Sequence, residues 1–170
     1  RHTGVGDTTI GTHPTVSHDE IAPITQAFAD AGIAVTLARD LQCVLWSKLL
    51  VNATINPLTA LTRVRNGDLP LRDDTSRLIR IVTRECEQIA SSAGIALGYD
   101  SLEKRVQSVC EATARNRSSM LQDVLRGRRT EIDAINGSVV SKAKAVGTQA
   151  PVNELLVGLV KASGVQDEAD

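Results

Sequence analysis

Residues 46–60 read "WSKLLVNATINPLTA", and this stretch decides how the rest of the chain is interpreted. Its apolar residues recur at the three- and four-residue spacing of a helix that packs against a core. Lys48, Asn52 and Asn56 interrupt the apolar pattern at intervals of four. Because a helix turns by about 100° per residue, these positions drift by only about 40° per step and share one side. The stretch therefore predicts a core helix with a polar stripe.

The polar stripe formed by Lys48, Asn52 and Asn56 has two interpretations. Taken one at a time, the lysine is explained as a solvated charge. The asparagines are then groups that cap or satisfy the backbone, with Asn56 ending the helix before Pro57. Taken together, the three residues fit this interpretation less well, because asparagine is unfavourable in a helix interior. Amides at these positions are better explained if they face a polar ligand.

The composition is that of an ordinary globular domain, and it argues against several classes of function. The 170 residues suffice for one substantial domain or for one and a fraction. Nineteen basic residues against twenty acidic ones give a formal charge of −1, so the electrostatic footprint of a protein that binds nucleic acid or an anionic membrane is missing. No apolar run approaches the roughly 18 residues that a membrane span needs. We therefore expect neither nucleic acid nor a membrane as a partner.

The three cysteines, Cys43, Cys86 and Cys110, are odd in number and widely spaced. Their spacing matches no zinc motif, and each lies on an apolar helical face, so we expect no metal site. Buried, reduced thiols are the interpretation that follows, and they indicate a cytoplasmic protein. Because the chain has only one Phe, one Trp and one Tyr, the core is predicted to consist of Leu, Ile, Val and Ala.

The N-terminal part of the chain differs from the rest. Residues 2–12, "HTGVGDTTIGT", alternate around a Gly-Asp pair and predict a strand pair or hairpin. Their glycines lack the spacing of the dinucleotide fingerprint, and we expect no parallel-sheet unit around them. Ser17 and Glu20 stand in capping-box spacing ahead of a helix that ends near Gly32, and residues 33–37 form a candidate strand.

After Asp40, a predicted N-cap, almost the whole chain shows helical periodicity. Apolar residues recur every three or four positions in residues 41–56, 71–93, 101–114, 119–125, 132–146 and 152–162. Helix-ending residues punctuate this pattern at Asn56-Pro57, Asn66-Gly67, Gly94, Asn116, Gly127, Gly147 and Pro151. The sequence therefore predicts a small piece of β structure followed by about six helices.

This asymmetry predicts a mainly α fold in three parts. Residues 1–39 are interpreted as the trailing strands and helix of an upstream α/β domain that is incomplete in this sequence. Residues 40–163 form an all-helical domain, and residues 164–170 form a tail.

Two long motifs give the chain a resemblance to a known family. The stretch "WSKLLVNATINPLTALTRVRNGDL" (46–69) closely resembles the central motif of the ketopantoate reductases (2-dehydropantoate 2-reductases). "NRSSMLQDVLRGRRTEIDAINGSVV" (116–140) resembles the second signature of that family. The two motifs occur in the family's order and at about its separation. The segment "HTGVGDTTIG" (2–11) is similar to the last strands of the family's nucleotide-binding domain.

The resemblance implies a function and a fold. The family reduces the ketone of 2-dehydropantoate (ketopantoate) to pantoate with NADPH, a step of pantothenate and coenzyme A biosynthesis. Its C-terminal domain is helical, of the 6-phosphogluconate-dehydrogenase-like type, and follows a Rossmann domain, which here is the implied partner of the chain. The implied roles are proton donor for Lys48, substrate binding for Asn52, Asn56, Asn66 and Ser119, and cofactor binding for Glu131.

These roles agree with the chemistry of the side chains. An ammonium stabilises the alkoxide that hydride addition produces and then supplies its proton, and amides both donate to and accept from substrate oxygens. Ser119 with Gln122 also predicts a capping box, at a helix N-terminus that suits a substrate carboxylate. Asn66-Gly67 also predicts a turn. The position of Glu131 at a helix start is equally that of a solvated residue that favours the helix dipole.

The family's glycine-rich cofactor loop and its upstream substrate-binding asparagine do not occur in this sequence. We therefore expect a piece of a longer protein that is inactive alone and whose NADPH is bound mainly by the missing domain. Two alternatives stay open. One is a related reductase of another branched 2-oxo acid, and the other is a non-catalytic helical module for dimerisation or small-molecule binding. The sequence also leaves open whether the protein is a homodimer.

Overall fold

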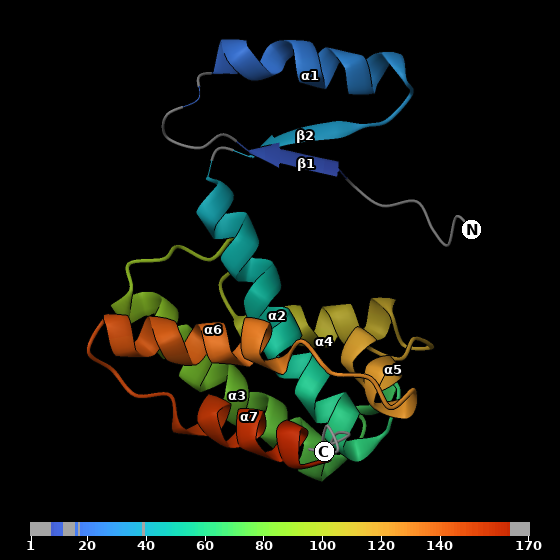
Figure 1. Ribbon diagram of the computed structural model, residues 1–170, viewed down its shortest axis with the longest axis vertical. Helices are drawn as coiled ribbons and strands as arrows, with labels where there is room; N and C mark the ends of the chain where they lie inside the picture. Colours follow the sequence, from blue (N-terminus) through green and yellow to red (C-terminus); the bar gives the residue numbers. More distant parts are fainter. Residues whose placement is uncertain (1–7, 12–15, 17, 39, 164–170) are drawn as a thin grey trace, which may run out of the picture. The chain divides into compact units, whose positions relative to one another are not determined.

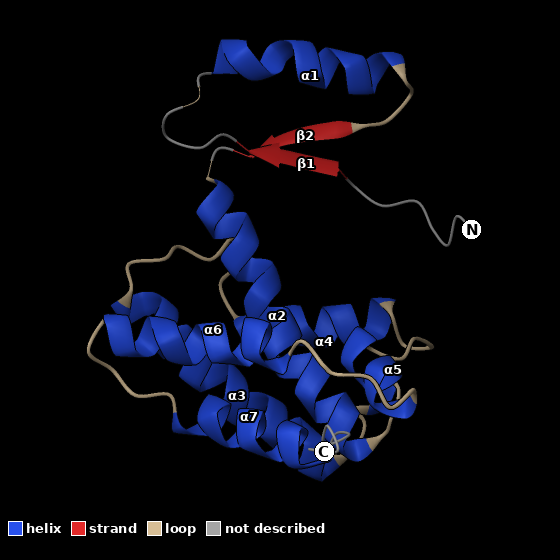
Figure 2. Ribbon diagram, in the orientation of Figure 1, coloured by secondary structure: helices blue, strands red, loops and turns tan. Residues whose placement is uncertain are grey.

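The computed structural model describes residues 8–11, 16, 18–38 and 40–163. The chain falls into two compact units, Arg1–Leu45 and Trp46–Asp170. The fold is mainly α (Figure 2), as the periodicity predicts. In chain order the elements are β1 (Thr8–Gly11), α1 (His18–Asp30), β2 (Val35–Ala38), α2 (Leu41–Thr62), the short 3-10 helix η1 (Asn66–Asp68), α3 (Asp73–Ser92), α4 (Leu102–Ala112), α5 (Ser119–Leu125), α6 (Ile132–Ala145) and α7 (Pro151–Ser163).

The N-terminal unit contains two parallel strands joined by a helix (Figure 1). β1 pairs with β2 in a register that sets Thr8 opposite Val35. Parallel neighbours need a long crossover connection, and α1 supplies it. The hairpin predicted within residues 2–12 is therefore wrong for the residues that the structure describes, since the partner of β1 is β2. The expectation that no parallel-sheet unit is present is wrong for the same reason.

Two predicted helix boundaries in this unit are confirmed. α1 ends before Gly32, which adopts a left-handed φ of 73°. The N–H groups of Gly32 and Ile33 donate to carbonyls of the last turn and so satisfy the helix end. Asp40 caps α2, because its Oδ1 accepts from the Cys43 N–H at 3.0 Å. The predicted cap of α1, Ser17, lies outside the described residues.

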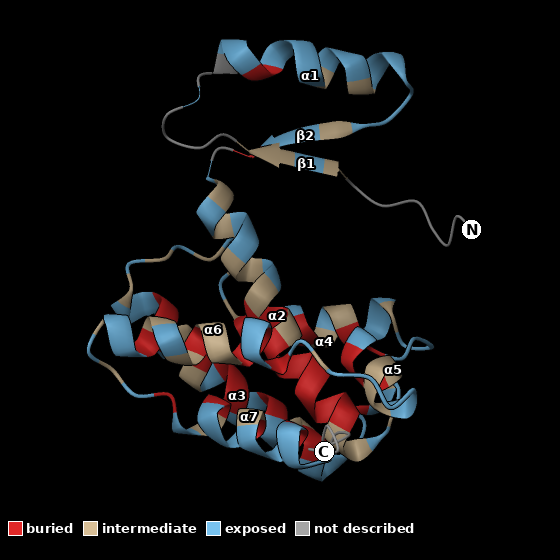
Figure 3. Ribbon diagram, viewed as in Figure 1, coloured by how far each residue is buried: buried red, intermediate tan, exposed pale blue. Residues whose placement is uncertain are grey.

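The C-terminal half of α2 forms the centre of the helical unit (Figure 3). Every residue from Leu50 to Ala60 except Asn52 is buried. One hydrophobic cluster joins this segment to side chains of α3, α4, α5, α6 and α7. Trp46 and Tyr99 only pack against the cluster while partly buried, so aliphatic side chains dominate the core as predicted. A helix that is apolar nearly all round is stable only when other helices surround it.

The prediction that Asn56 ends this helix before Pro57 is wrong, because α2 continues to Thr62. Proline has no N–H, so the carbonyl four residues earlier, that of Ala53, loses its intrahelical partner. The Asn136 amide of α6 takes this place, with Nδ2 2.9 Å from the Ala53 oxygen. A side chain from a distant helix thus replaces the missing backbone donor, and α2 continues through the proline.

The Asn136 amide belongs to a chain of polar contacts that links four helices. Its Nδ2 also donates to Asn153 Oδ1 of α7 at 2.9 Å. Asn153 Nδ2 in turn donates to Glu85 Oε1 of α3 at 2.7 Å. The Glu85 carboxylate also accepts from the backbone N–H groups of Val152 and Asn153, at 2.9 and 2.8 Å. One glutamate therefore caps the start of α7 and anchors the chain of amides that ends on α2.

The start of α5 differs by one residue from its prediction. The N-cap is Ser118 and not Ser119, since Ser118 Oγ accepts from the Leu121 N–H at 3.1 Å. Ser118 Oγ also lies 2.7 Å from Thr59 Oγ1 of α2, a buried contact that fixes which serine turns inward. Gln122 makes no capping box, because its amide donates to a preceding carbonyl instead.

Ser118→Ala should lower the free energy of unfolding by about 1–2 kcal/mol, because it removes an N-cap and the side-chain partner of Thr59. Ser119→Ala removes an exposed hydroxyl and should change the same free energy by less than about 0.5 kcal/mol. Urea denaturation of both variants beside the parent chain measures the difference. Equal losses at the two serines, or a larger loss at Ser119, would contradict this capping assignment.

Candidate active site

The predicted polar stripe is present on α2, and it becomes more buried along the helix. Lys48 is exposed, Asn52 is half-buried and Asn56 keeps only 6 % of its surface exposed. Because α2 is continuous through these positions, they lie along one side of it. The stripe therefore leads from the surface of the helical unit towards its interior.

The side chains of the stripe have no partners within the described residues. Neither of the ion pairs found there involves Lys48, and none of the side-chain hydrogen bonds there involves Asn52 or Asn56. Among the residues that the structure describes, the buried polar side-chain atoms that lack a partner are Asn66 Oδ1 and Asn136 Oδ1. The Asn56 amide is not among them, so its polar atoms still reach solvent although the residue is buried. The ammonium and both amides are thus free to bind a ligand.

Two further predicted residues stand at the starts of helices. Ser119 is the first residue of α5 and is exposed. Because Ser118 serves as the cap, the Ser119 hydroxyl is not committed to the helix. Glu131 is the N-cap residue of α6; it is exposed and makes no side-chain capping hydrogen bond. Among the residues described, neither side chain has a hydrogen-bonding or ionic partner.

Asn66 is used by the fold itself. It is buried, its Nδ2 donates to Thr113 Oγ1 at 2.9 Å, and its N–H donates to the Asn116 carbonyl at 3.1 Å. A Cβ on the next residue, Gly67, would stand 2.5 Å from Ala114 Cβ, so a side chain does not fit there. The predicted turn thus holds the segment before α5 in place through these hydrogen bonds. A role of Asn66 in substrate binding would use Oδ1, its one polar side-chain atom without a partner in the described structure.

Two contacts show which of the predicted segments lie together. The hydroxyl contact between α2 and the start of α5 involves Ser118, the direct neighbour of Ser119. The amide contact between α2 and α6 involves Ala53, the direct neighbour of Asn52. The helix that carries the stripe is therefore joined to both segments of the second motif. The convergence of Lys48 with Ser119 and Glu131 on one face stays a prediction.

A cation–π contact extends the interface of α2 and α6 towards Lys48. Lys142 Nζ lies 5.4 Å from the centroid of the Trp46 ring. The two contacts occur in opposite order along the two helices. On α6, Asn136 comes before Lys142, whereas on α2 the partner of Lys142, Trp46, comes before the partner of Asn136, Ala53. α6 therefore follows α2 along the turns that carry the first two residues of the stripe.

Asn136 and Asn153 are not among the residues that the sequence pattern predicts for the site. Both have 0 % of their surface exposed, on helices whose neighbouring buried side chains are mostly apolar. The sequence contains a signal for both residues, because a buried asparagine in a helix is unfavourable unless its amide forms hydrogen bonds. Both residues are asparagines within a helix, as Asn52 is. Their partners, Ala53 and Glu85, could not be identified, because they are far away in the sequence.

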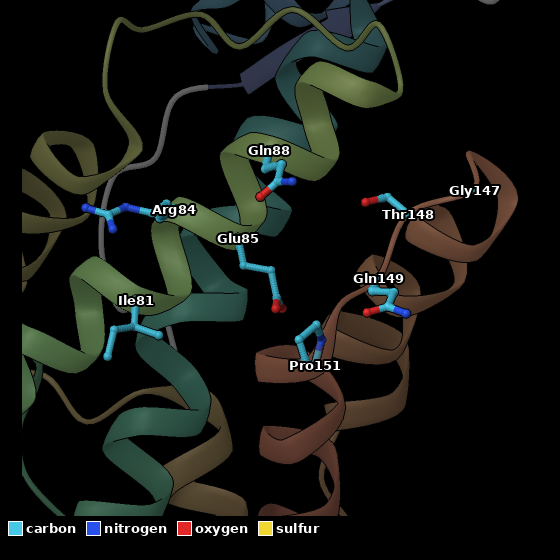
Figure 4. Close-up of a pocket in the computed structure, with 8 residues that line it drawn as sticks. All are labelled: Ile81, Arg84, Glu85, Gln88, Gly147, Thr148, Gln149 and Pro151. Atoms are coloured by element: carbon cyan, nitrogen blue, oxygen red, sulfur yellow. The ribbon is translucent and has the colours of Figure 1, made fainter.

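The helical unit also has a hollow that lies apart from the predicted site residues (Figure 4). It has a volume of about 600 Å³ and is lined by Ile81, Arg84, Glu85, Gln88, Gly147, Thr148, Gln149 and Pro151. None of the predicted site residues is among these. Glu85, which points into the hollow, is already bonded to the start of α7. The hollow is therefore explained by the packing of α3 against the segment that joins α6 to α7.

The three thiols differ in burial. Cys86 and Cys110 are buried as predicted, whereas Cys43 is half-exposed. The prediction of burial is wrong for Cys43 because it lies in the first turn of α2, before the segment that enters the core. Burial raises the pKa of Cys86 to about 12 and that of Cys110 to about 11, so both stay neutral thiols near pH 7.

Residues 8–11, 16, 18–38 and 40–163 offer neither a metal site nor a membrane-spanning helix. No group of three or more histidine, cysteine or acidic side chains in these ranges could hold a metal ion. The helices of the same ranges include none that is long and apolar enough to cross a membrane.

Comparison with known proteins relates the chain to one family. The family described as "Ketopantoate reductase PanE/ApbA C terminal" matches residues 40–164. The 2-dehydropantoate 2-reductase of Archaeoglobus fulgidus is 36 % identical over 160 residues, which cover 94 % of this chain and 53 % of that protein. The chain thus spans about half the length of the curated relatives that it matches.

Solved structures agree with the fold. The crystal structure of a PanE/ApbA family ketopantoate reductase from Ralstonia eutropha JMP134 matches with a TM-score of 0.83 and 32 % identity, covering 96 % of this chain and 53 % of that one. D-mandelate dehydrogenase, solved with NADH and anilino(oxo)acetate, matches with a TM-score of 0.86 and 22 % identity, covering 96 % and 68 %. This second likeness shows the fold alone. The predicted fold, a helical domain preceded by a short β segment, is confirmed.

The raised pKa values of the buried thiols predict how stability depends on alkaline pH. A thiol whose pKa is raised by folding contributes stability that is complete below the unfolded pKa and lost as pH rises through the folded pKa. For Cys86 this loss falls between pH 9.0 and about 12. The free energy of unfolding from urea melts should therefore fall over this range, and it should fall less steeply in Cys86→Ala. Identical pH slopes for variant and parent would be incompatible with this account.

Proposed function

The chain belongs to the ketopantoate reductase family, and we propose that it forms the substrate-binding and proton-donating half of an enzyme that reduces 2-dehydropantoate to pantoate in pantothenate and coenzyme A biosynthesis. The observation that carries this proposal is the stripe of Lys48, Asn52 and Asn56 on α2, whose side chains are unpartnered among the described residues. The matching curated relatives bear the name 2-dehydropantoate 2-reductase, which supports this reaction over the two alternatives that the sequence left open.

The reaction needs a hydride at the ketone carbon and a proton at the ketone oxygen. NADPH, when bound, supplies the hydride. Negative charge then develops on the oxygen, where the ammonium of Lys48 stabilises it. Lys48 Nζ next transfers a proton to this oxygen and so forms the new hydroxyl group of pantoate. Because Lys48 is exposed, it can regain its proton from water before the next turnover.

The amides and the Ser119 hydroxyl would hold the rest of the substrate. Ketopantoate carries a carboxylate and a hydroxyl group besides its ketone, so its site needs both donors and acceptors. The Asn52 and Asn56 amides offer both, and the Ser119 hydroxyl donates to a carboxylate. Asn66 has only its Oδ1 to offer, and because this acceptor is buried in the described structure, a bond to the substrate hydroxyl would require the turn at Asn66 to open.

Glu131 is the described residue that best fits the cofactor. Its carboxylate is exposed and uncommitted to helix capping, so its oxygens can accept from the hydroxyl groups of a ribose. The glycine-rich fingerprint that cradles the phosphates of a dinucleotide is missing from the 170 residues. We therefore propose that a joined nucleotide-binding domain holds most of the NADPH and sets the preference between NADPH and NADH.

The proposed enzyme divides this chain into three parts. Residues 1–39 are the trailing part of the nucleotide-binding domain, residues 40–163 are the substrate domain, and residues 164–170 are a tail. The parallel strands β1 and β2 with their crossover helix support the first assignment, since such units build nucleotide-binding sheets. In this scheme the enzyme acts in the cytoplasm, and the chain alone does not turn over substrate.

Lys48→Ala in the full-length enzyme should lower kcat on ketopantoate by about 10²- to 10⁴-fold, because it removes the proton donor and its charge. Folding should be unaffected, since Lys48 is exposed. Asn52→Ala and Ser119→Ala should chiefly raise KM, because they hold the ground state and the transition state alike. Steady-state measurement of NADPH oxidation tests all three variants.

The matched control is Lys104→Ala, which removes another exposed lysine of the helical unit and should leave both kinetic constants unchanged. A Lys48→Ala enzyme that keeps most of its turnover would defeat the catalytic assignment. If the parent enzyme ignores ketopantoate but reduces another branched 2-oxo acid, the substrate assignment is wrong while the role of Lys48 stands.

A further inference from the structure

Pro57 stands inside α2, where proline normally breaks or kinks a helix. The helix nevertheless continues to Thr62. The proline removes the hydrogen bond to the Ala53 carbonyl, and its ring crowds that carbonyl. Proline also disfavours a helical backbone at the residue before it, which is Asn56. By local chemistry, the turn from Ala53 to Asn56 is therefore the weakest of the helix, and it lies between the two amides of the polar stripe.

The Asn136 side chain compensates for this weakness. Its Nδ2 lies 2.9 Å from the Ala53 oxygen. Neither residue has any exposed surface, so bulk water cannot supply another donor to the carbonyl. A buried carbonyl that loses its hydrogen-bond donor lowers the stability of the fold. The helical conformation of this turn therefore depends on one amide from α6.

The direction of the Asn136 amide is fixed by its other neighbours. Glu85 accepts hydrogen bonds at the start of α7, so Asn153 turns its Nδ2 towards that carboxylate. Asn153 then presents Oδ1 to Asn136 at 2.9 Å. Asn136 must in turn direct Nδ2 at the oxygens of both Asn153 and Ala53. An amide in this orientation satisfies the two oxygens together, which neither a carboxylate nor an apolar side chain does.

We propose that Asn136 is a positioning residue for the substrate site: by donating to the Ala53 carbonyl, it keeps α2 helical across Pro57 and so holds the two amides of the stripe in line. The inference rests on the proposed function, which takes Asn52 and Asn56 as the amides that bind the oxo acid. We assign the Asn136 side chain no contact with the reacting groups, because it is fully buried. Its Nδ2 donates to two protein oxygens, and its Oδ1 has no partner among the described residues.

A merely structural role predicts different behaviour. Loss of a buried contact lowers the stability of a core wherever the contact lies, without a specific effect on substrate binding. A positioning role predicts that the affinity for substrate follows the state of the Ala53 carbonyl. Pro57→Ala makes this distinction testable, because alanine restores the backbone N–H that bonds to the carbonyl four residues earlier.

In the full-length enzyme, Asn136→Ala should raise KM for ketopantoate by about tenfold to a hundredfold, the scale expected when a binding group moves by about an ångström. Val139→Ala is the matched control, since Val139 is buried one turn further along α6. It should lose thermal stability through a cavity while KM stays within about twofold of the parent value. Steady-state kinetics and thermal melts of each variant measure both effects.

The double variant Pro57→Ala/Asn136→Ala decides between the two roles. Its KM should return to the value of Pro57→Ala alone, although the other contact of Asn136 is still missing. A raised KM that persists in the double variant, or an unchanged KM in folded Asn136→Ala, would overturn the proposal. If Asn136→Ala alone does not fold, a folded double variant with normal KM supports the proposal, and an unfolded one overturns it.

Hydrogen exchange provides a readout that needs no substrate. The backbone amides of residues 52–56 and 58–60 should exchange faster in Asn136→Ala and regain protection in the double variant. If the parent enzyme does not reduce ketopantoate, the proposed function fails, but the exchange pattern still tests the action of Asn136 on α2. Unchanged exchange of these amides in Asn136→Ala would then refute the inference by itself.

Discussion

The hydrogen bond from Asn136 to the Ala53 carbonyl is the contact on which the helical unit depends. α2 is the centre of the core, and it contains a proline that would break an isolated helix. The bond is held in place by Asn153 and Glu85, so four helices share one chain of polar contacts. A typical hydrogen bond contributes only about 1 kcal/mol net, whereas a buried polar group left unpaired costs about 1–3 kcal/mol. Asn136 Oδ1 already has no partner among the described residues, so losing the bond to Ala53 would leave a further buried oxygen of these helices unpaired.

The parts of the fold that local chemistry determines could be predicted, and those that distant contacts determine could not. Asp40 as an N-cap and Gly147 as a helix end follow from residues only a few positions apart. Pro57 was misinterpreted as a helix end because the compensating donor lies 83 residues from the carbonyl that it satisfies. The choice of Ser118 over Ser119 as the cap depends on a hydroxyl 59 residues away. The parallel partner of β1 likewise lies beyond a whole helix.

The candidate site shows the same division. The polar stripe could be predicted because four-residue spacing on a helix is a local property, and the structure leaves its side chains unpartnered among the described residues. Asn66 could be predicted as a turn residue, but its bond to Thr113 comes from packing that the sequence does not reveal. Asn136 lies inside the second family motif, yet the motif alone gives it no role. Its role follows only from the structure, where α6 meets the weakest turn of α2.

We propose that the stripe on α2 binds a 2-oxo acid with Lys48 as its proton donor. The most direct test is a crystal structure of the full-length enzyme with NADP⁺ and ketopantoate, a combination that cannot react for lack of a hydride. The account predicts that Lys48 Nζ lies about 3 Å from the ketone oxygen, within reach for proton transfer, and that the amides of the stripe contact the substrate. An oxo acid bound away from α2, with Lys48 directed into solvent, would contradict it.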